Sequence, residues 1–109
     1  MTQIVYDPDG PSLRMQGHAG AGEKGGDLVC AALSALMMTL ERRMLDRAEQ
    51  MRPEITRSGD RFEIRCRPDE EDEAACRESF ETVAAGLTLL SENRPDCVQI
   101  RDMREEFEA

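Results

Sequence analysis

The longest uninterrupted segment of this sequence constrains its fold more than any other feature. Residues 28–47 contain no glycine or proline, and apolar side chains occupy almost every side of the first three turns of the helix that they predict. A helix of this kind has to be covered on more than one side. Charged side chains return from Glu41 onward, so we expect the last turns to emerge into solvent. The chain has 109 residues, 39% of them hydrophobic, which predicts one domain spanning residues 1–109.

Strand and turn signals surround this helix. Strand-forming or alternating residues predict strands at residues 2–6, 12–16, 53–57, 61–67 and 97–101, and three- and four-residue apolar steps predict an amphipathic helix at residues 73–93. Turn residues at 7–10 and 58–60 join the first four strands into two hairpins. The order β-β-α-β-β-α-β predicts an α+β fold, a mostly antiparallel sheet with two helices. The charged residues 103–109 predict a frayed end.

Charge and cysteine usage exclude several classes of protein. The formal net charge of −9 argues against nucleic acid as a direct partner and favours a basic protein. No apolar run approaches the ~20 residues of a membrane span, and the first residues do not resemble a signal peptide.

The four cysteines, at positions 30, 66, 76 and 97, form no C-x-x-C pair, which argues against a structural metal and for reduced thiols in the cytoplasm. The acidic residues 69–73 are more typical of a solvated helix start than of a metal site.

Reactive residue types meet in one part of the sequence. His18, the only histidine, follows a predicted strand, and Cys30 lies in the first turn of the apolar helix. Residues 17–26 between these elements contain five glycines, which predicts a mobile loop. A helix N-terminus favours the thiolate over the thiol, and its N–H groups could bind an oxyanion. His18 could then act as a general base toward Cys30 and as an acid toward the leaving amine.

Structural interpretations of the same residues remain open. A lone histidine after a strand is usually a surface residue, and a lone cysteine in an apolar helix is usually part of the core. The glycine-rich loop could be an anion cradle, but it lacks the Lys-Ser/Thr ending of a P-loop. Ser34 could donate a hydrogen bond to the thiolate or simply bond to its own helix. Asp27 could orient His18 or serve only as an N-cap.

The residues around this candidate pair resemble a known family. Gly17-His18-Ala19, a glycine-rich loop, and the helical string Gly26-Asp27-Leu28-Val29-Cys30-Ala31-Ala32-Leu33-Ser34-Ala35-Leu36 are similar to the ribosomal-processing cysteine protease family, known as Prp. The resemblance is dense over residues 17–40 and matches both catalytic positions.

This resemblance implies a small, homodimeric, cytoplasmic endopeptidase. Such an enzyme removes a short N-terminal extension from a bacterial large-subunit ribosomal protein and needs no metal or organic cofactor. The resemblance assigns Cys30 as the nucleophile and His18 as the base, with supporting roles for Asp27 and Ser34. The resemblance also implies that the loop between them is a mobile lid over the substrate. The glycines of this lid are Gly20, Gly22, Gly25 and Gly26.

Two other functions compete with proteolysis. A ribosome-associated binding module could use the same groove without cutting its partner. A thiol redox sensor could use Cys30 alone, although no resolving cysteine lies near it in the sequence.

Overall fold

The computed structural model describes residues 1–17 and 26–107, apart from the side chains of residues 26, 27, 106 and 107. Its elements in chain order are the strands β1 (Thr2–Asp7) and β2 (Ser12–Gly17), the helices α1 (Gly26–Asp46) and α2 (Ala48–Met51), the strands β3 (Glu54–Ser58) and β4 (Arg61–Arg65), the 3-10 helix η1 (Glu70–Asp72), the helix α3 (Glu73–Asn93), the strand β5 (Val98–Asp102) and the 3-10 helix η2 (Met103–Phe107). The predicted α+β class and the predicted order of the main elements are confirmed. The short helix α2 and the two 3-10 helices are additions that the sequence did not predict.

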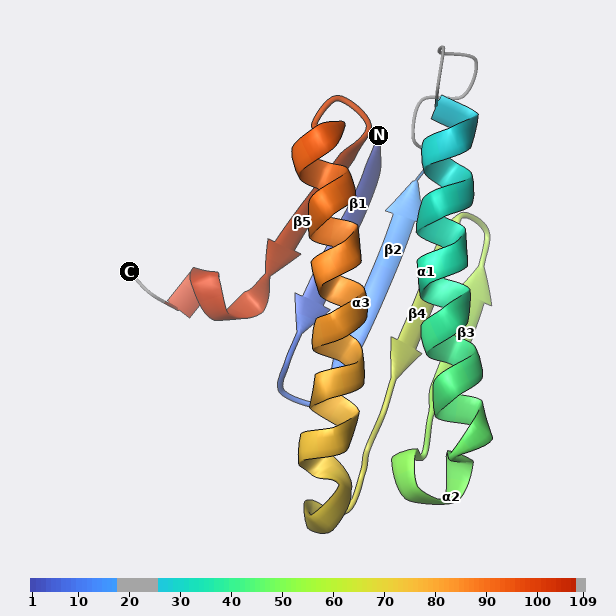
Figure 1. The fold of residues 1–109 in the computed structure, drawn as a ribbon, viewed down its shortest axis with the longest axis vertical. Helices are drawn as coiled ribbons and strands as arrows, with labels where there is room; N and C mark the ends of the chain where they lie inside the picture. The colour runs from blue at the N-terminus through green and yellow to red at the C-terminus, as the bar shows by residue number, and fades with distance from the viewer. Residues whose placement is uncertain (18–25, 108–109) are drawn as a thin grey trace.

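The five strands form one mixed sheet in the order β3-β4-β2-β1-β5. Three neighbouring pairs are antiparallel, as expected for a sheet built from two hairpins. The fourth pair, β1 with β5, is parallel, with Ile4 opposite Ile100. The parallel pair arises because α3 carries the chain back along the sheet, so that β5 runs in the direction of β1 (Figure 1).

The long helices α1 and α3 lie side by side over one face of the sheet (Figure 1). Alternation along the strands sends Ile4, Tyr6 and Leu13 toward the helices, where they are buried. Every third or fourth residue of α3, including Phe80 and Leu87, faces the same core. The helix layer and one sheet face therefore share a single hydrophobic core.

The helix α1 is covered on more than one side, as expected, but its outer side is exposed. Leu28 is 77% exposed and Met38 is 53% exposed, while Leu33 and Met37 are fully buried. The sheet and α3 cover two sides of α1, but the described residues supply nothing that covers the third. The apolar character of this helix therefore exceeds what the core of one chain uses. Among the same residues, no helix combines the length and apolar character that a membrane span requires.

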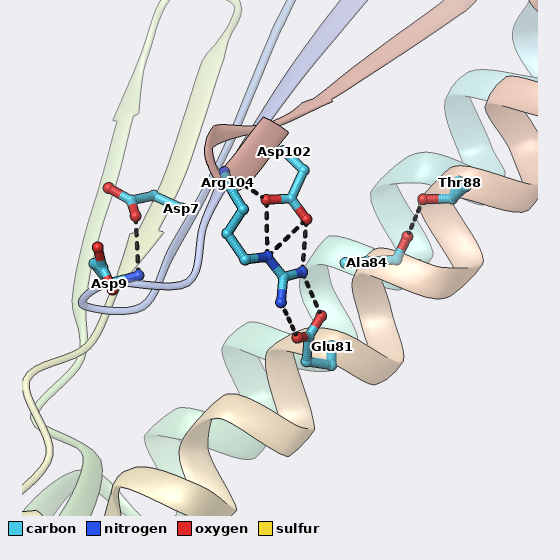
Figure 2. A network of polar contacts seen from close by, with 7 residues as sticks. All are labelled: Asp7, Asp9, Glu81, Ala84, Thr88, Asp102 and Arg104. Carbon is cyan, nitrogen blue, oxygen red and sulfur yellow. Dashed lines mark hydrogen bonds and ion pairs between the residues drawn. The ribbon is translucent and has the colours of Figure 1, made fainter. Parts of the chain in front are cut away.

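The segment after β5, for which the sequence predicts a frayed end, forms η2. Arg104 donates hydrogen bonds to Asp102 next to it and to Glu81 on α3, at distances of 2.6 and 3.1 Å for the shortest contact to each (Figure 2). The guanidinium of Arg104 also lies 5.7 Å from the ring centroid of Tyr6. These contacts join the residues after β5 to the helix layer.

Candidate active site

Cys30 is the fifth residue of α1, because the helix begins at Gly26 rather than at Leu28. The N–H groups without an intrahelical partner are those of the first four helical residues, so they precede Cys30. Helical side chains tilt toward the N-terminus, which inclines the Cys30 side chain toward this first turn. The thiol is half-buried and packs against the edge of the core.

Cys30 lines a surface hollow of about 260 Å³. One wall comes from α1, and the other comes from the start of β1, the end of β2 and the β3–β4 hairpin. The lining residues are Thr2, Met15, Gly17, Cys30, Leu33, Ser34, Arg57, Gly59, Asp60, Arg61 and Phe62. A half-buried thiol in a concave site with apolar and polar walls is suited to nucleophilic attack on a bound molecule.

Residues from both ends of the predicted catalytic motif line the hollow. Gly17, the last residue of β2, lines the hollow together with Cys30 on α1. His18 follows Gly17 directly in the sequence but lies outside the described residues, as do Gly20, Gly22 and Gly25. The structure thus places the residue before His18 and the candidate nucleophile at the same site.

The supporting residues of the prediction divide into three cases. Ser34 is half-buried one helical turn after Cys30 and lines the same hollow. Asp27 belongs to the first turn of α1, where an acidic residue suits the helix dipole, but its side chain is not described. Gly26, counted with the loop in the sequence, is the first residue of α1.

Sequence reasoning missed the contribution of the β3–β4 hairpin. Arg57 on β3 donates two hydrogen bonds to the carboxylate of Glu41 on α1, at 2.6 and 2.9 Å. Its guanidinium carbon lies 4.1 Å from the ring centroid of Phe62 on β4. Hydrogen bonding to Arg57 lowers the pKa of Glu41 below its usual value. The local sequence carries no signal for this contact, because it joins residues 16 positions apart in different elements.

The other three cysteines, Cys66, Cys76 and Cys97, are fully buried away from the hollow. A hydrogen bond to Cys76, together with burial, raises the pKa of the Cys66 thiol. Cys97 contacts Arg94 through its sulfur at 3.1 Å. In the part of the chain that the structure describes, no group of three or more histidine, cysteine or acidic residues could hold a metal ion.

The fold and the half-buried thiol in its hollow are consistent with a cysteine protease, and comparison with known proteins identifies the family. A family model described as cysteine protease Prp matches residues 2–99. The chain therefore belongs to the Prp family of cysteine proteases. A search of curated protein sequences found no match to this chain.

Three crystal structures illustrate the similarity of the fold. The ribosomal processing protease Prp from S. aureus with a covalently linked product peptide has a TM-score of 0.77 at 24% identity, over 94% of this chain and 99% of that chain. The same protease with a substrate peptide has a TM-score of 0.78 at 21% identity over the same shares. The protein SMU.848 from Streptococcus mutans has a TM-score of 0.67 at 26% identity, over 93% of this chain and 90% of that chain.

Proposed function

We propose that this protein is an endopeptidase in which Cys30 is the nucleophile and His18 is the general base. The observation that carries the proposal is the shared hollow, which Cys30 lines together with the residue that precedes His18. Membership of a cysteine protease family supports the same chemistry.

The reaction follows from the properties of a thiol and an imidazole. His18 accepts the proton of the Cys30 thiol, and the thiolate attacks the scissile carbonyl carbon. The unpaired N–H groups of the first turn of α1 stabilise the oxyanion. His18 then donates the proton to the leaving amine, and water hydrolyses the remaining thioester to release the second product and the free thiol. No step requires a metal or an organic cofactor.

We propose as substrate the precursor of a large-subunit ribosomal protein, from which the enzyme removes the N-terminal extension. The neighbouring S. aureus structures are of a ribosomal processing protease, one with a substrate peptide bound. Ribosomal proteins are basic, and a chain of net charge −9 attracts basic partners before specific contacts form. This substrate would place the enzyme in the cytoplasm.

A peptide that spans the extension junction of the ribosomal protein from the same genome tests both parts of the proposal. We expect specific cleavage by the wild type and none by Cys30→Ala or His18→Ala. Tight binding of the peptide without any product would instead indicate a binding module. Cleavage that persists in His18→Ala would refute the proposed base.

The supporting residues and the lid are part of the same proposal. We expect Ser34→Ala and Asp27→Ala to reduce kcat, because Ser34 lines the hollow and Asp27 precedes Cys30 by one helical turn. For the loop, replacing Gly25 and Gly26 by proline should slow peptide turnover while Cys30 still reacts with a small alkylating agent. Equal loss of both activities would show that these residues hold the site together instead of gating it.

The exposed apolar side of α1 supports a homodimer. Leu28 and Met38 lie on this side, and a shallow groove lined by Ala31, Ala35 and Met38 runs along it. A second copy of the chain would cover this surface. Sedimentation velocity should show a dimer for the wild type and a monomer for Met38→Glu. A wild-type monomer at micromolar concentration would refute this part of the proposal.

A further inference from the structure

Arg57 is the long polar side chain that links the two walls of the Cys30 hollow. It extends from β3, which lies at the edge of the sheet and, within the described residues, pairs with β4 alone. Its partner Glu41 is on α1, the helix that carries Cys30, eleven residues further along. Eleven residues are close to three helical turns, so Glu41 and Cys30 lie on the same side of the helix.

The guanidinium of Arg57 is held from two directions. Glu41 accepts hydrogen bonds from both terminal nitrogens, and the ring of Phe62 lies beneath the guanidinium plane. Phe62 is buried and Glu41 is largely buried, with 15% of its side chain exposed. The Arg57 side chain is 53% exposed, so a molecule in the hollow can reach a donor that is already fixed in position.

The guanidinium of Arg57 has more N–H groups than its bonds to Glu41 use. A guanidinium carries five N–H groups, and the bonds to Glu41 use one on each terminal nitrogen. The structure gives no acceptor, among the residues it describes, for the three that remain. Because Glu41 already balances the positive charge, a neutral acceptor suits these groups better than a carboxylate, which would lie beside a like charge.

We propose that Arg57 donates a hydrogen bond to a main-chain carbonyl oxygen of the bound peptide, and that Glu41 is the positioning residue that holds Arg57 for this contact. The proposal rests on the peptidase function proposed above. A fixed donor lowers the cost of ordering the peptide on binding. The contact does not depend on side-chain sequence, and the neutral ion pair does not repel a basic substrate.

Steady-state kinetics on the junction peptide tests the proposal. We expect Arg57→Met to raise KM about tenfold with kcat within about twofold, the size of one lost hydrogen bond to a charged donor. Glu41→Gln should raise KM several-fold. Arg57→Lys should give a KM between those of the wild type and Arg57→Met, because lysine lacks the planar guanidinium group. The matched control is Arg52→Met, which breaks an exposed ion pair with Asp69 outside the hollow and should leave KM unchanged.

Two further measurements separate binding from folding and from chemistry. Alkylation of Cys30 by iodoacetamide should proceed at the wild-type rate in every Arg57 and Glu41 variant. Anisotropy of the labelled peptide should show weaker binding to Cys30→Ala/Arg57→Met than to Cys30→Ala, which tests the inference even if the wild type cleaves nothing. An unchanged KM in Arg57→Met, or joint loss of kcat and alkylation, would overturn the proposal.

A thioamide scan of the peptide locates the acceptor, because a thiocarbonyl accepts hydrogen bonds weakly. We expect a thioamide at one of the positions other than the scissile bond to weaken binding of the peptide to Cys30→Ala. The same thioamide should have no further effect on binding to Cys30→Ala/Arg57→Met. Equal sensitivity of both proteins at every position would exclude a main-chain carbonyl as the partner of Arg57.

Discussion

The backbone of Gly17 packs directly against the carbonyl oxygen of Met1. A Cβ atom built on Gly17 would overlap that oxygen, and the φ angle of Gly17, +95°, is one that residues with side chains rarely adopt. Gly17 pairs with Thr2 in the antiparallel register of β1 and β2. The end of β2 can therefore approach the start of β1 only with glycine at this position.

Alanine at position 17 should disrupt the candidate active site more than it disrupts the fold. The added methyl group forces the strand end away from Met1, and His18 is the next residue. We expect Gly17→Ala to lower kcat/KM for the junction peptide by at least about tenfold and the free energy of unfolding by about 1–3 kcal/mol.

Gly59 provides the control for this substitution. It also lines the hollow and has a positive φ of +60°, but a Cβ there meets no atom within 4 Å. Gly59→Ala should cost about 1 kcal/mol of stability, with a much smaller effect on kcat/KM. Equal losses of kcat/KM in the two variants would show that the contact with Met1 does not matter.

The four thiols should differ sharply in reactivity. Cys30 is half-buried at the hollow, while Cys66, Cys76 and Cys97 are fully buried. We expect an aromatic disulfide reagent to modify one thiol per native chain, with the other three reacting only after unfolding. Mass spectrometry of the modified peptide should identify Cys30, and no fast reaction should remain in Cys30→Ala. Fast modification of a second cysteine would contradict the burial of the core thiols.

The ion pairs of Arg104 should make a small contribution to stability that acid removes. Hydrogen bonds from Arg104 lower the pKa of Asp102. A group whose pKa is lower in the folded state stabilises the protein above its unfolded-state pKa, and this contribution is lost as the pH falls through the folded-state pKa. We expect Arg104→Met to reduce the free energy of unfolding by at most about 1 kcal/mol at pH 7, because the partners are partly exposed.

Urea titrations at pH 7 and at pH 3 or below measure this effect. The difference between wild type and Arg104→Met should shrink as the pH falls below 3.8, the ordinary pKa of an aspartate. The control is Arg42→Met, whose pair with Asp46 is highly exposed and should contribute only a few tenths of a kcal/mol. A difference that grows on acidification would mean that Asp102 is not stabilised in its charged form.

The close approach of α1 and α3 at Gly86 should limit the size of this residue. A Cβ on Gly86 would lie 3.1 Å from both terminal methyl carbons of Leu36. Alanine requires a small movement of a flexible side chain and gains helix propensity, so Gly86→Ala should change stability by less than about 1 kcal/mol. Gly86→Leu should cost about 1–3 kcal/mol by overpacking.

Chemical denaturation of these variants and of two further ones checks this contact. Leucine at the neighbouring exposed position, Ala85→Leu, should be nearly neutral. Combining Gly86→Leu with Leu36→Ala should recover part of the loss, because the smaller side chain makes room. A full loss that persists in the double variant would place the strain elsewhere than at Leu36.

Much of the fold could be predicted from local pattern alone. The bounds of α3 agree with the predicted helix at residues 73–93, because apolar residues recur at three- and four-residue steps and acidic residues precede it. The two hairpins and the α+β class were also predicted, since strand alternation and turn residues act over a few positions. The catalytic pair, His18 and Cys30, remains a prediction from the sequence, and the structure adds the hollow that Cys30 shares with Gly17.

The contacts between distant segments required the tertiary structure. No local signal places β5 parallel to β1, or Arg57 against Glu41 and Phe62, because these pairings depend on where the sheet ends and how α1 crosses it. Which side of α1 stays exposed also depends on the tertiary structure, since periodicity reports how apolar a helix is and not how many neighbours cover it. The sequence by itself therefore determined the elements and the reactive residue types of this protein, while only the tertiary structure decided the walls of the site around Cys30.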